Sequence, residues 1–225
     1  MRDETAAAPL AQVVVDRLRE RWGAGVVTDA AELDYFRTDV QAQGQPLLAV
    51  LRPADAAQLA VAVGALTGAG VAVIPRGGGM SYTGGYLAVR QPSVLIDTTT
   101  LDRVVEINVE DAYAVVDAGV TWRDLRAALD AHGVRTPYRG PMSGSHATVG
   151  GALSQGSIFH GSGRYGCSAE TVLGLEVVTA TGEVLRTGSA AAGTTPFFRW
   201  HGPDLTGVFL GDCGLLGIKT RATLR

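Results

Sequence analysis

The sequence predicts an α+β protein of two lobes, a small parallel α/β lobe followed by a larger lobe with an antiparallel sheet and helices. Between residues 43 and 103, apolar strand patterns alternate with an alanine-rich helix, as in a parallel α/β unit. From Val104 onward the strand patterns come in pairs joined by short polar turns, which favours antiparallel hairpins. The 30 glycines are clustered between these elements, which indicates that function lies in the loops.

Residues 1–42 are predicted to form an N-terminal helical segment, because apolar residues recur at helical spacing over Leu10–Trp22. The first lobe, residues 43–103, is predicted to contain in order a strand over Leu47–Leu51, a helix from Asp55 to Gly68, a strand over Val71–Ile74 and a strand over Ser93–Asp97.

The second lobe, residues 104–225, begins with a predicted hairpin, and Thr121 and Asp124 then resemble a capping box in which Asp replaces Glu. Its predicted elements are the hairpin strands Val104–Asn108 and Tyr113–Ala118, a helix from Thr121 to Gly133, the hairpin strands Val172–Ala180 and Glu183–Arg186, and a last strand over Gly217–Leu224.

Composition excludes several functions. The net charge of -3 and the scattered Lys and Arg residues disfavour nucleic-acid binding. Cys167 and Cys213 are too few for a disulfide scaffold or a zinc site, so a cytoplasmic location is expected. His132 is expected to lie at the end of a helix, His160 and His201 have no partner at metal-binding spacing, and no metal is predicted. The sequence shows neither a signal peptide nor a stretch of about 18 apolar residues that would span a membrane.

The glycine-rich segment Pro75–Gly85 directly follows a predicted buried strand. Successive small residues there can turn backbone N–H groups inward as a nest for phosphate oxygens, and Ser81 and Thr83 add hydroxyl donors. The alternative is an ordinary glycine-rich turn between strands. The strand context, the hydroxyls and Arg76 favour the phosphate interpretation.

Neither common nucleotide fingerprint fits this segment. Gly77-Gly78-Gly79 leads to Gly84-Gly85 and another loop, whereas a Rossmann motif opens a helix. The nearest approach to a P-loop, Gly217–Thr220, has Ile between Gly and Lys and lies in a strand pattern. A second candidate, Thr148–Gly151, is by its residues alone better explained as the start of a helix capped by Thr.

Several separated motifs, taken in order, resemble the vanillyl-alcohol-oxidase-type (PCMH-type) FAD-binding domain of glycolate oxidase subunits and D-lactate dehydrogenases. The resemblance covers roughly Gln45–Leu224. It is carried by Pro75–Gly85, Asp97 with Leu101, Thr148–Gly151, Gly163–Gly166, Val172–Val178, Gly182-Glu183, Gly202–Leu205 and Gly211–Thr220.

The resemblance implies an FAD held in extended form between the two lobes. The implied pyrophosphate contacts are Pro75, Arg76, Gly77, Gly78, Gly79, Met80, Ser81 and Tyr82. The implied ribityl and ring contacts are Pro141, Met142, Ser143, Thr148, Gly150 and Gly151, and those of the adenine are Gly217 and Ile218. Tyr165 and Arg164 are placed beside the flavin, although for Arg164 an exposed turn is an equal alternative. Cys213 is expected to be a small buried thiol beside the adenine.

For function, the resemblance implies a flavin-dependent oxidoreductase that oxidises a 2-hydroxy acid or related alcohol. The substrate-facing groups of such enzymes lie largely in a cap domain, which is expected to be absent from this chain, so no catalytic residue is assigned. The alternative is a non-catalytic flavin-binding or electron-transfer module that works with a separate subunit. Met80 and His146 replace the His and Cys that link flavin in the berberine-bridge branch, so the FAD is predicted to be non-covalent.

Overall fold

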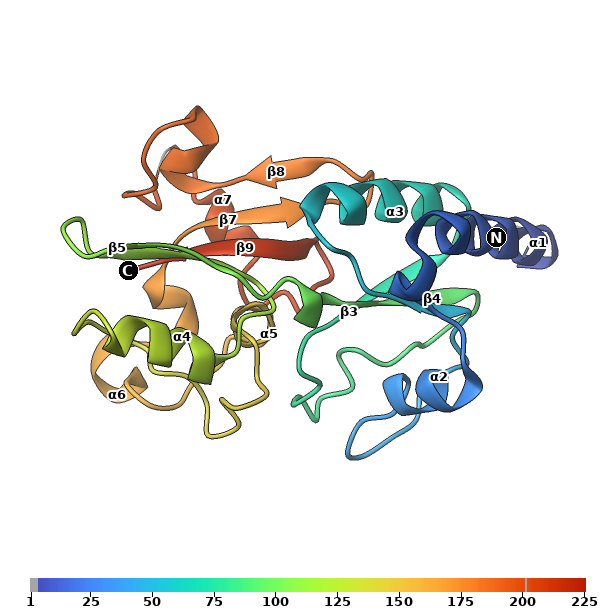
Figure 1. Cartoon of the computed structure of the whole chain (residues 1–225), viewed down its shortest axis with the longest axis horizontal. Coiled ribbons are helices and arrows are strands. Elements are labelled where there is room, and N and C mark those ends of the chain that lie inside the picture. Colours follow the sequence, from blue (N-terminus) through green and yellow to red (C-terminus); the bar gives the residue numbers. More distant parts are fainter. Residues whose placement is uncertain (1–3, 201) are drawn as a thin grey trace.

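The two predicted lobes are present in the computed structural model, which describes residues 4–200 and 202–225. Two separate sheets lie along the long axis of the molecule, with the glycine-rich loops between them (Figure 1). The predicted α+β fold, with one mainly parallel and one antiparallel sheet, is confirmed. No described helix is long and apolar enough to cross a membrane. His201 lies outside the described residues.

The first lobe has a four-stranded sheet in the order β1-β2-β4-β3, in which only β1 runs antiparallel to its neighbour. Its elements are α1 (Glu4–Trp22), β1 (Val26–Val27), α2 (Ala30–Phe36), β2 (Ala49–Leu51), α3 (Ala56–Gly68), β3 (Ala72–Arg76) and β4 (Ser93–Asp97). The predicted strands and helices of this lobe are confirmed. Strand β3 reaches Arg76, so Pro75 and Arg76 belong to the sheet and the loop starts at Gly77.

Helix α3 starts where the sequence predicts because the Asp55 carboxylate accepts the Gln58 N–H at 2.7 Å, which satisfies one of the free donors of the first turn. Its buried face packs with α1 and β4 in a core that also takes Val178 and Ile218 from the second sheet. The hydrophobic core of the first lobe is therefore completed by residues of the second lobe.

The second lobe has an antiparallel five-stranded sheet in the order β5-β6-β9-β7-β8. Its elements are β5 (Val104–Asn108), β6 (Tyr113–Asp117), α4 (Trp122–Asp130), α5 (Val149–Gln155), α6 (Ser162–Tyr165), β7 (Val172–Val178), β8 (Val184–Arg186), α7 (Leu205–Val208) and β9 (Ile218–Leu224). The predicted Thr121 cap is confirmed, since Thr121 Oγ1 accepts the Asp124 N–H at 3.1 Å. The Asp124 carboxylate accepts the Thr121 hydroxyl at 2.6 Å and not the Thr121 N–H, so the reciprocal bond of a capping box is absent between these two residues.

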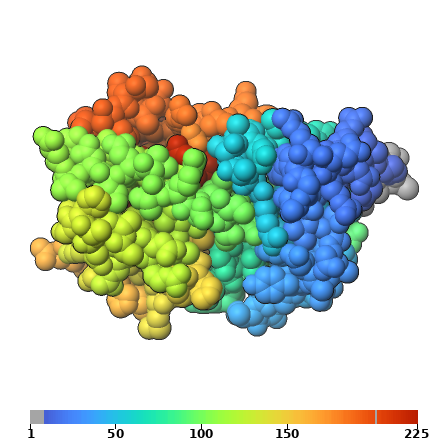
Figure 2. Space-filling model, viewed as in Figure 1, coloured from blue at the N-terminus to red at the C-terminus, as the bar shows by residue number. Residues whose placement is uncertain are grey.

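The lobes touch where α3 meets the turn between β7 and β8. Thr67 Oγ1 donates to the Ala180 carbonyl at 2.6 Å, and a Cβ added at Gly182 would lie 2.5 Å from the Ala60 carbonyl oxygen. Gly182 also has a φ of 80°, which glycine adopts without strain. Figure 2 shows the blue and cyan first lobe in contact with the green second lobe on this face. The spacing of the lobes is thus fixed by backbone contact.

Candidate cofactor site between the lobes

The loop after β3 offers a row of free hydrogen-bond donors. Within the part of the chain that the structure describes, the backbone N–H groups of residues 77–82 donate to no protein acceptor, whereas those of Thr83 and Gly84 do. The Ser81 and Thr83 hydroxyls lie 2.9 Å apart at the end of this row. Unpaired N–H groups in succession can form a concave donor surface for an anion. Phosphate binding by this loop stays a prediction.

Arg76 adds a buried positive charge beneath the loop. Its guanidinium lies over the rings of Tyr35, Phe36 and Tyr86, with its carbon 5.3, 4.8 and 5.2 Å from their centroids. The residue is 8% exposed, and its Nε finds no hydrogen-bond partner among the described residues. A buried cation held by aromatic faces and without a carboxylate partner favours a bound anion above it.

Sequence reasoning found Arg76 but missed the three rings around it. Tyr35 and Phe36 belong to α2, and Tyr86 follows the loop and donates its hydroxyl to the Gly79 carbonyl at 3.0 Å. Burial raises the pKa of Tyr86, which keeps this hydroxyl protonated as a donor.

The loop glycines face protein atoms of the second lobe. A Cβ added at Gly77 would overlap the Thr148 hydroxyl, and one added at Gly78 would overlap the His146 carbonyl oxygen. Thr148 is 1% exposed, so it cannot move away into solvent. Glycine is therefore required at positions 77 and 78 because the backbones of the two lobes lie so close together there.

Thr148 caps the N-terminus of helix α5, as the residues alone predict. The N–H groups of Val149, Gly150 and Gly151 donate to the Val120 carbonyl, the Ala118 carbonyl and Thr148 Oγ1. A Cβ at Gly150 would lie 2.7 Å from the Ala118 Cβ, so packing on the strand end of β6 explains this glycine. These first-turn donors are therefore used within the protein and are not offered to a ligand.

The segment 141–146 lies beside the loop and is open to solvent. Met142 is 82% exposed, and Met80 and Tyr82 are also exposed. His146 is exposed, with Nδ1 2.9 Å from the Ser145 hydroxyl. Among the described residues, the N–H groups of Met142, Ser143 and Ser145 have no acceptor. This surface presents thioethers, an aromatic ring and free amides on the solvent side of the cleft.

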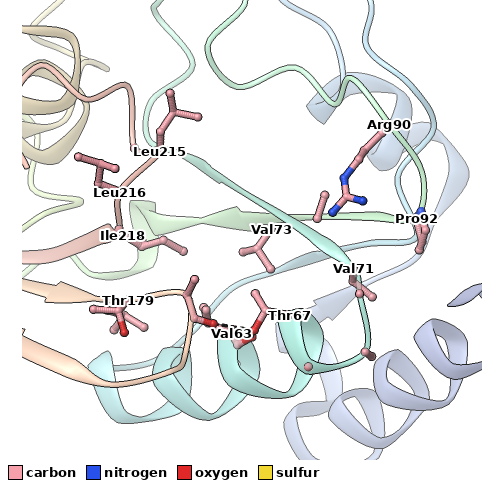
Figure 3. Close-up of a pocket in the computed structure, with 18 of the residues that line it drawn as sticks. Val63, Thr67, Val71, Val73, Arg90, Pro92, Thr179, Leu215, Leu216 and Ile218 are labelled. Carbon is pink, nitrogen blue, oxygen red and sulfur yellow. Dashed lines mark hydrogen bonds between the residues drawn. The ribbon is translucent and has the colours of Figure 1, made fainter. Parts of the chain in front are cut away.

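A cavity of about 820 Å³ lies beside β3, where Ala72 and Val73 line it (Figure 3). Gly217 and Ile218 line it at the start of β9, and Gly214 touches the end of β3, since a Cβ there would lie 2.6 Å from Pro75 Cγ. The Ile218 side chain is buried in the first-lobe core. The cavity thus lies beside the strand that leads into the glycine-rich loop.

The cavity wall formed by residues 214–216 is held by a buried ion pair. Lys219 Nζ lies 2.6 Å from Asp212 Oδ1, and both side chains are less than 5% exposed. Asp212 also accepts the N–H groups of Gly214 and Leu216 at 3.0 and 3.3 Å. Burial lowers the pKa of Lys219, against the opposing effect of Asp212. The carboxylate therefore fixes the turn that covers the cavity.

The expectation of a buried thiol at Cys213 is wrong. The residue is exposed and has a φ of 53°, in the left-handed region that non-glycine residues rarely adopt. Neither Cys167 nor Cys213 forms a disulfide. The described residues also contain no group of three or more His, Cys, Asp or Glu side chains that could hold a metal ion.

Tyr165 ends α6 under two guanidinium groups. Arg135 and Arg164 lie over its ring at 5.6 and 5.3 Å from the centroid, and Arg135 donates to its hydroxyl at 3.4 Å. The hydrogen bond from Arg135, together with the charge of Arg164, lowers the pKa of Tyr165. The phenolate is stabilised because it faces positive charge.

We expect Tyr165 to ionise at a lower pH than an ordinary tyrosine, which has a value of 10.0. In a spectrophotometric titration of phenolate absorbance, Tyr165→Phe should remove the earliest component. Arg135→Ala should move that component to higher pH. An unchanged titration curve in Arg135→Ala would contradict this assignment.

A family model described as FAD binding domain matches residues 47–188. The chain is 34% identical over 155 residues to the glycolate oxidase subunit GlcD of Bacillus subtilis, covering 69% of this chain and 32% of that protein. It is 31% identical over 205 residues to an uncharacterised FAD-linked oxidoreductase of Mycobacterium tuberculosis, covering 90% of this chain and 43% of that protein.

Solved structures show the same fold. An alkyldihydroxyacetonephosphate synthase superposes with a TM-score of 0.80 at 22% identity, covering 94% of this chain and 43% of that one. p-Cresol methylhydroxylase superposes with a TM-score of 0.80 at 21% identity, and the match covers 94% of this chain and 42% of that one. The chain spans about a third to two fifths of the length of the relatives it matches. Because the family model matches residues 47–188, more than half of the chain, the chain belongs to the FAD-binding domain family, and it shares its fold with p-cresol methylhydroxylase.

Proposed function

We propose that the two lobes, the first of which includes α1, β1 and α2 as well as residues 43–103, bind one FAD in the cleft between them. The pyrophosphate lies on residues 77–83, above Arg76, and the adenosine half lies in the cavity beside Gly217 and Ile218. The flavin ring lies toward residues 141–146. The observation that carries this proposal is the row of unpaired N–H groups next to a buried guanidinium whose Nε has no partner among the described residues, on a strand that also borders a cavity of about 820 Å³.

We further propose that the full protein oxidises a 2-hydroxy acid or related alcohol. When bound, FAD supplies the hydride acceptor, and the protein orients the substrate. The support is the similarity to proteins named glycolate oxidase subunit and D-lactate dehydrogenase. Groups that hold the substrate are proposed to come from a further domain or a partner chain, because the matched part covers only 32% of that subunit. A cytoplasmic location stays a prediction.

The cofactor is expected to be FAD, not FMN, and to be dissociable. The donor row and the adjoining cavity suit a pyrophosphate with a nucleoside, and Met80 offers no nucleophile for the flavin. After reconstitution, acid precipitation should leave a colourless pellet, and mass analysis of the supernatant should identify FAD. A yellow pellet with a flavin-modified peptide containing His146 would show covalent attachment, and failure to bind FAD would refute the cofactor assignment.

The substrate class is tested on the reconstituted chain under anaerobic conditions. D-Lactate and glycolate are added in turn, and bleaching of the flavin absorbance is followed. We expect slow reduction by the chain alone, because the groups that orient the substrate over the ring are proposed to come from a further domain or a partner chain. Addition of the remaining part of the protein should make reduction fast. If neither acid reduces the flavin of the complete protein, the proposed substrate class is wrong while FAD binding stands.

A further inference from the structure

The part of the second lobe from residue 118 to residue 169 has the opposite charge balance to the whole chain. It contains five arginines and two aspartates, whereas the 225 residues contain 19 Lys and Arg against 22 Asp and Glu. Helices α4 and α6 lie in this segment, at the end of the molecule opposite α1 (Figure 1). The chain therefore carries a basic segment although its net charge is negative.

Four of these arginines form one exposed surface, which we call the arginine surface. Arg126, Arg135 and Arg139 line a single hollow beside α4. Arg135 and Arg164 both lie over the Tyr165 ring, at 5.6 and 5.3 Å from its centroid. The hydrogen bond from Arg135 and the charge of Arg164 lower the pKa of the Tyr165 hydroxyl, as a region of positive potential does.

The charges of the arginine surface are largely uncompensated. Among the described residues, Arg135, Arg139 and Arg164 form no ion pair with a carboxylate. Arg126 reaches Asp130 at 3.4 Å, but both side chains are nearly 60% exposed, so water weakens this pair. Because like charges repel one another, the surface gains most from a partner that brings negative charge to it.

The hollow within the arginine surface is too small for a metabolite. Its volume is about 10 Å³, which is room for one molecule the size of water. Trp122 lines the hollow, and its indole N–H is buried without an acceptor among the described residues. One water, or one oxygen atom of a partner, is the largest group that fits there. The arginines therefore act on a partner that lies outside, against the surface.

The pattern of charge favours a protein over a nucleic acid or a membrane. Asp124 and Asp130 stand on α4 among the arginines, and both side chains are 58% exposed. A row of phosphates or a lipid surface meets these two carboxylates as well as the arginines, and is repelled by them. A folded protein can place its own carboxylates opposite the arginines alone.

Apolar side chains adjoin the arginine surface. Ile158 is 73% exposed and Phe159 is 39% exposed. The chain that carries them is joined to the surface by the Arg139 N–H, which donates to the His160 carbonyl at 2.9 Å. Arginine and aromatic side chains are the types enriched in protein–protein interfaces, so the composition of this region also favours a protein partner.

We propose that the arginine surface binds an acidic protein, with Asp or Glu carboxylates of that partner paired to Arg135, Arg139 and Arg164. A guanidinium pairs with a carboxylate through two parallel hydrogen bonds, which fixes the orientation of the partner as well as attracting it. Phe159 adds an apolar contact beside these pairs. Binding of the acidic partner requires no cofactor, so it can be measured on the chain without FAD.

The probe is a fluorescein-labelled poly-L-glutamate peptide, whose fluorescence anisotropy is followed at low ionic strength, where surface charges are least screened. The triple variant Arg135→Glu, Arg139→Glu and Arg164→Glu should weaken binding on the order of 10- to 100-fold, because three attractive charge pairs become repulsive. The corresponding triple Lys variant keeps the charges and should stay within about threefold of the wild type.

The matched control makes the same change of net charge on α1, at the opposite end of the molecule. It is the triple variant Arg17→Glu, Arg19→Glu and Arg21→Glu, which alters three exposed arginines. Its affinity should stay within about threefold of the wild type, because α1 lies outside the proposed interface. An equal loss in this control overturns the proposal, since binding then follows net charge alone.

A thermal melt shows whether each variant is folded. If the triple Glu variant is unfolded, Arg139→Glu takes its place, because the Arg139 side chain makes no hydrogen bond within the described residues. Its expected loss is about three- to tenfold. Wild-type affinity in the folded Glu variant, or no binding of poly-L-glutamate to the wild type, overturns the proposal. So does tighter binding of oligodeoxythymidylate or of phosphatidylglycerol vesicles at the same ionic strength, which assigns the surface to nucleic acid or lipid.

Discussion

Gly78→Ala is expected to weaken FAD binding on the order of 10- to 100-fold. The added Cβ overlaps the His146 carbonyl oxygen, which is backbone and cannot rotate away. The loop must then shift by an amount that a packed interface resists, at a cost of about 1–3 kcal/mol. The shift displaces the row of N–H donors from the phosphate positions, so binding is lost even though no side chain enters the phosphate space.

Fluorescence titration of apo-protein with FAD measures this effect. The matched control is Gly163→Ala, because a Cβ at Gly163 meets nothing within 4 Å. Gly163→Ala should bind FAD as the wild type does. A thermal melt of each apo-variant separates lost binding from lost folding. If Gly78→Ala is folded and binds FAD with unchanged affinity, the close contact between loop and second lobe is not required for the site.

Lys219→Met is expected to lower the free energy of unfolding by about 3–5 kcal/mol, because it leaves the Asp212 carboxylate buried without its counter-ion. The double variant Asp212→Leu with Lys219→Met should recover much of this loss, since no buried charge remains. Urea denaturation of the wild type, Lys219→Met and the double variant measures the three free energies of unfolding. The double variant should still bind FAD less tightly, because Asp212 also holds the turn of residues 213–216 over the cavity.

An exposed pair provides the comparison. Arg126→Met breaks the pair with Asp130, in which both side chains are nearly 60% exposed, and should cost no more than about 1 kcal/mol. A similar small cost for Lys219→Met would mean that the buried pair contributes little to stability.

Local patterns predicted most of the fold. Strand β4 and helix α3 follow from an apolar run and an Asp cap, and both hairpins follow from alternation around a polar turn. The two residues of β1 are too few for a pattern, and α2 lies in a segment without clear periodicity. Both depend on packing against the rest of the lobe, which a single stretch of sequence does not encode.

The site was predictable in its donors and less so in its surroundings. The glycine-rich loop is a continuous stretch of sequence, so its hydrogen-bond donors could be predicted from the sequence alone. The aromatic rings around Arg76 come from residues about 40 positions earlier and 10 later, and their convergence is a product of the fold. At Gly150, glycine is explained by contact with Ala118, which no reading of the motif alone provides.

Strand β9 has a consequence for how the protein unfolds. Its first residue, Ile218, belongs to the core of the first lobe, while Ala222 and Leu224 belong to the core of the second. Neither core is complete without the strand, so the loss of β9 from its sheet opens both at once. The two lobes therefore form one cooperative unit, and the cofactor cleft opens only by melting the shared strand or by local movement of the loops that border it.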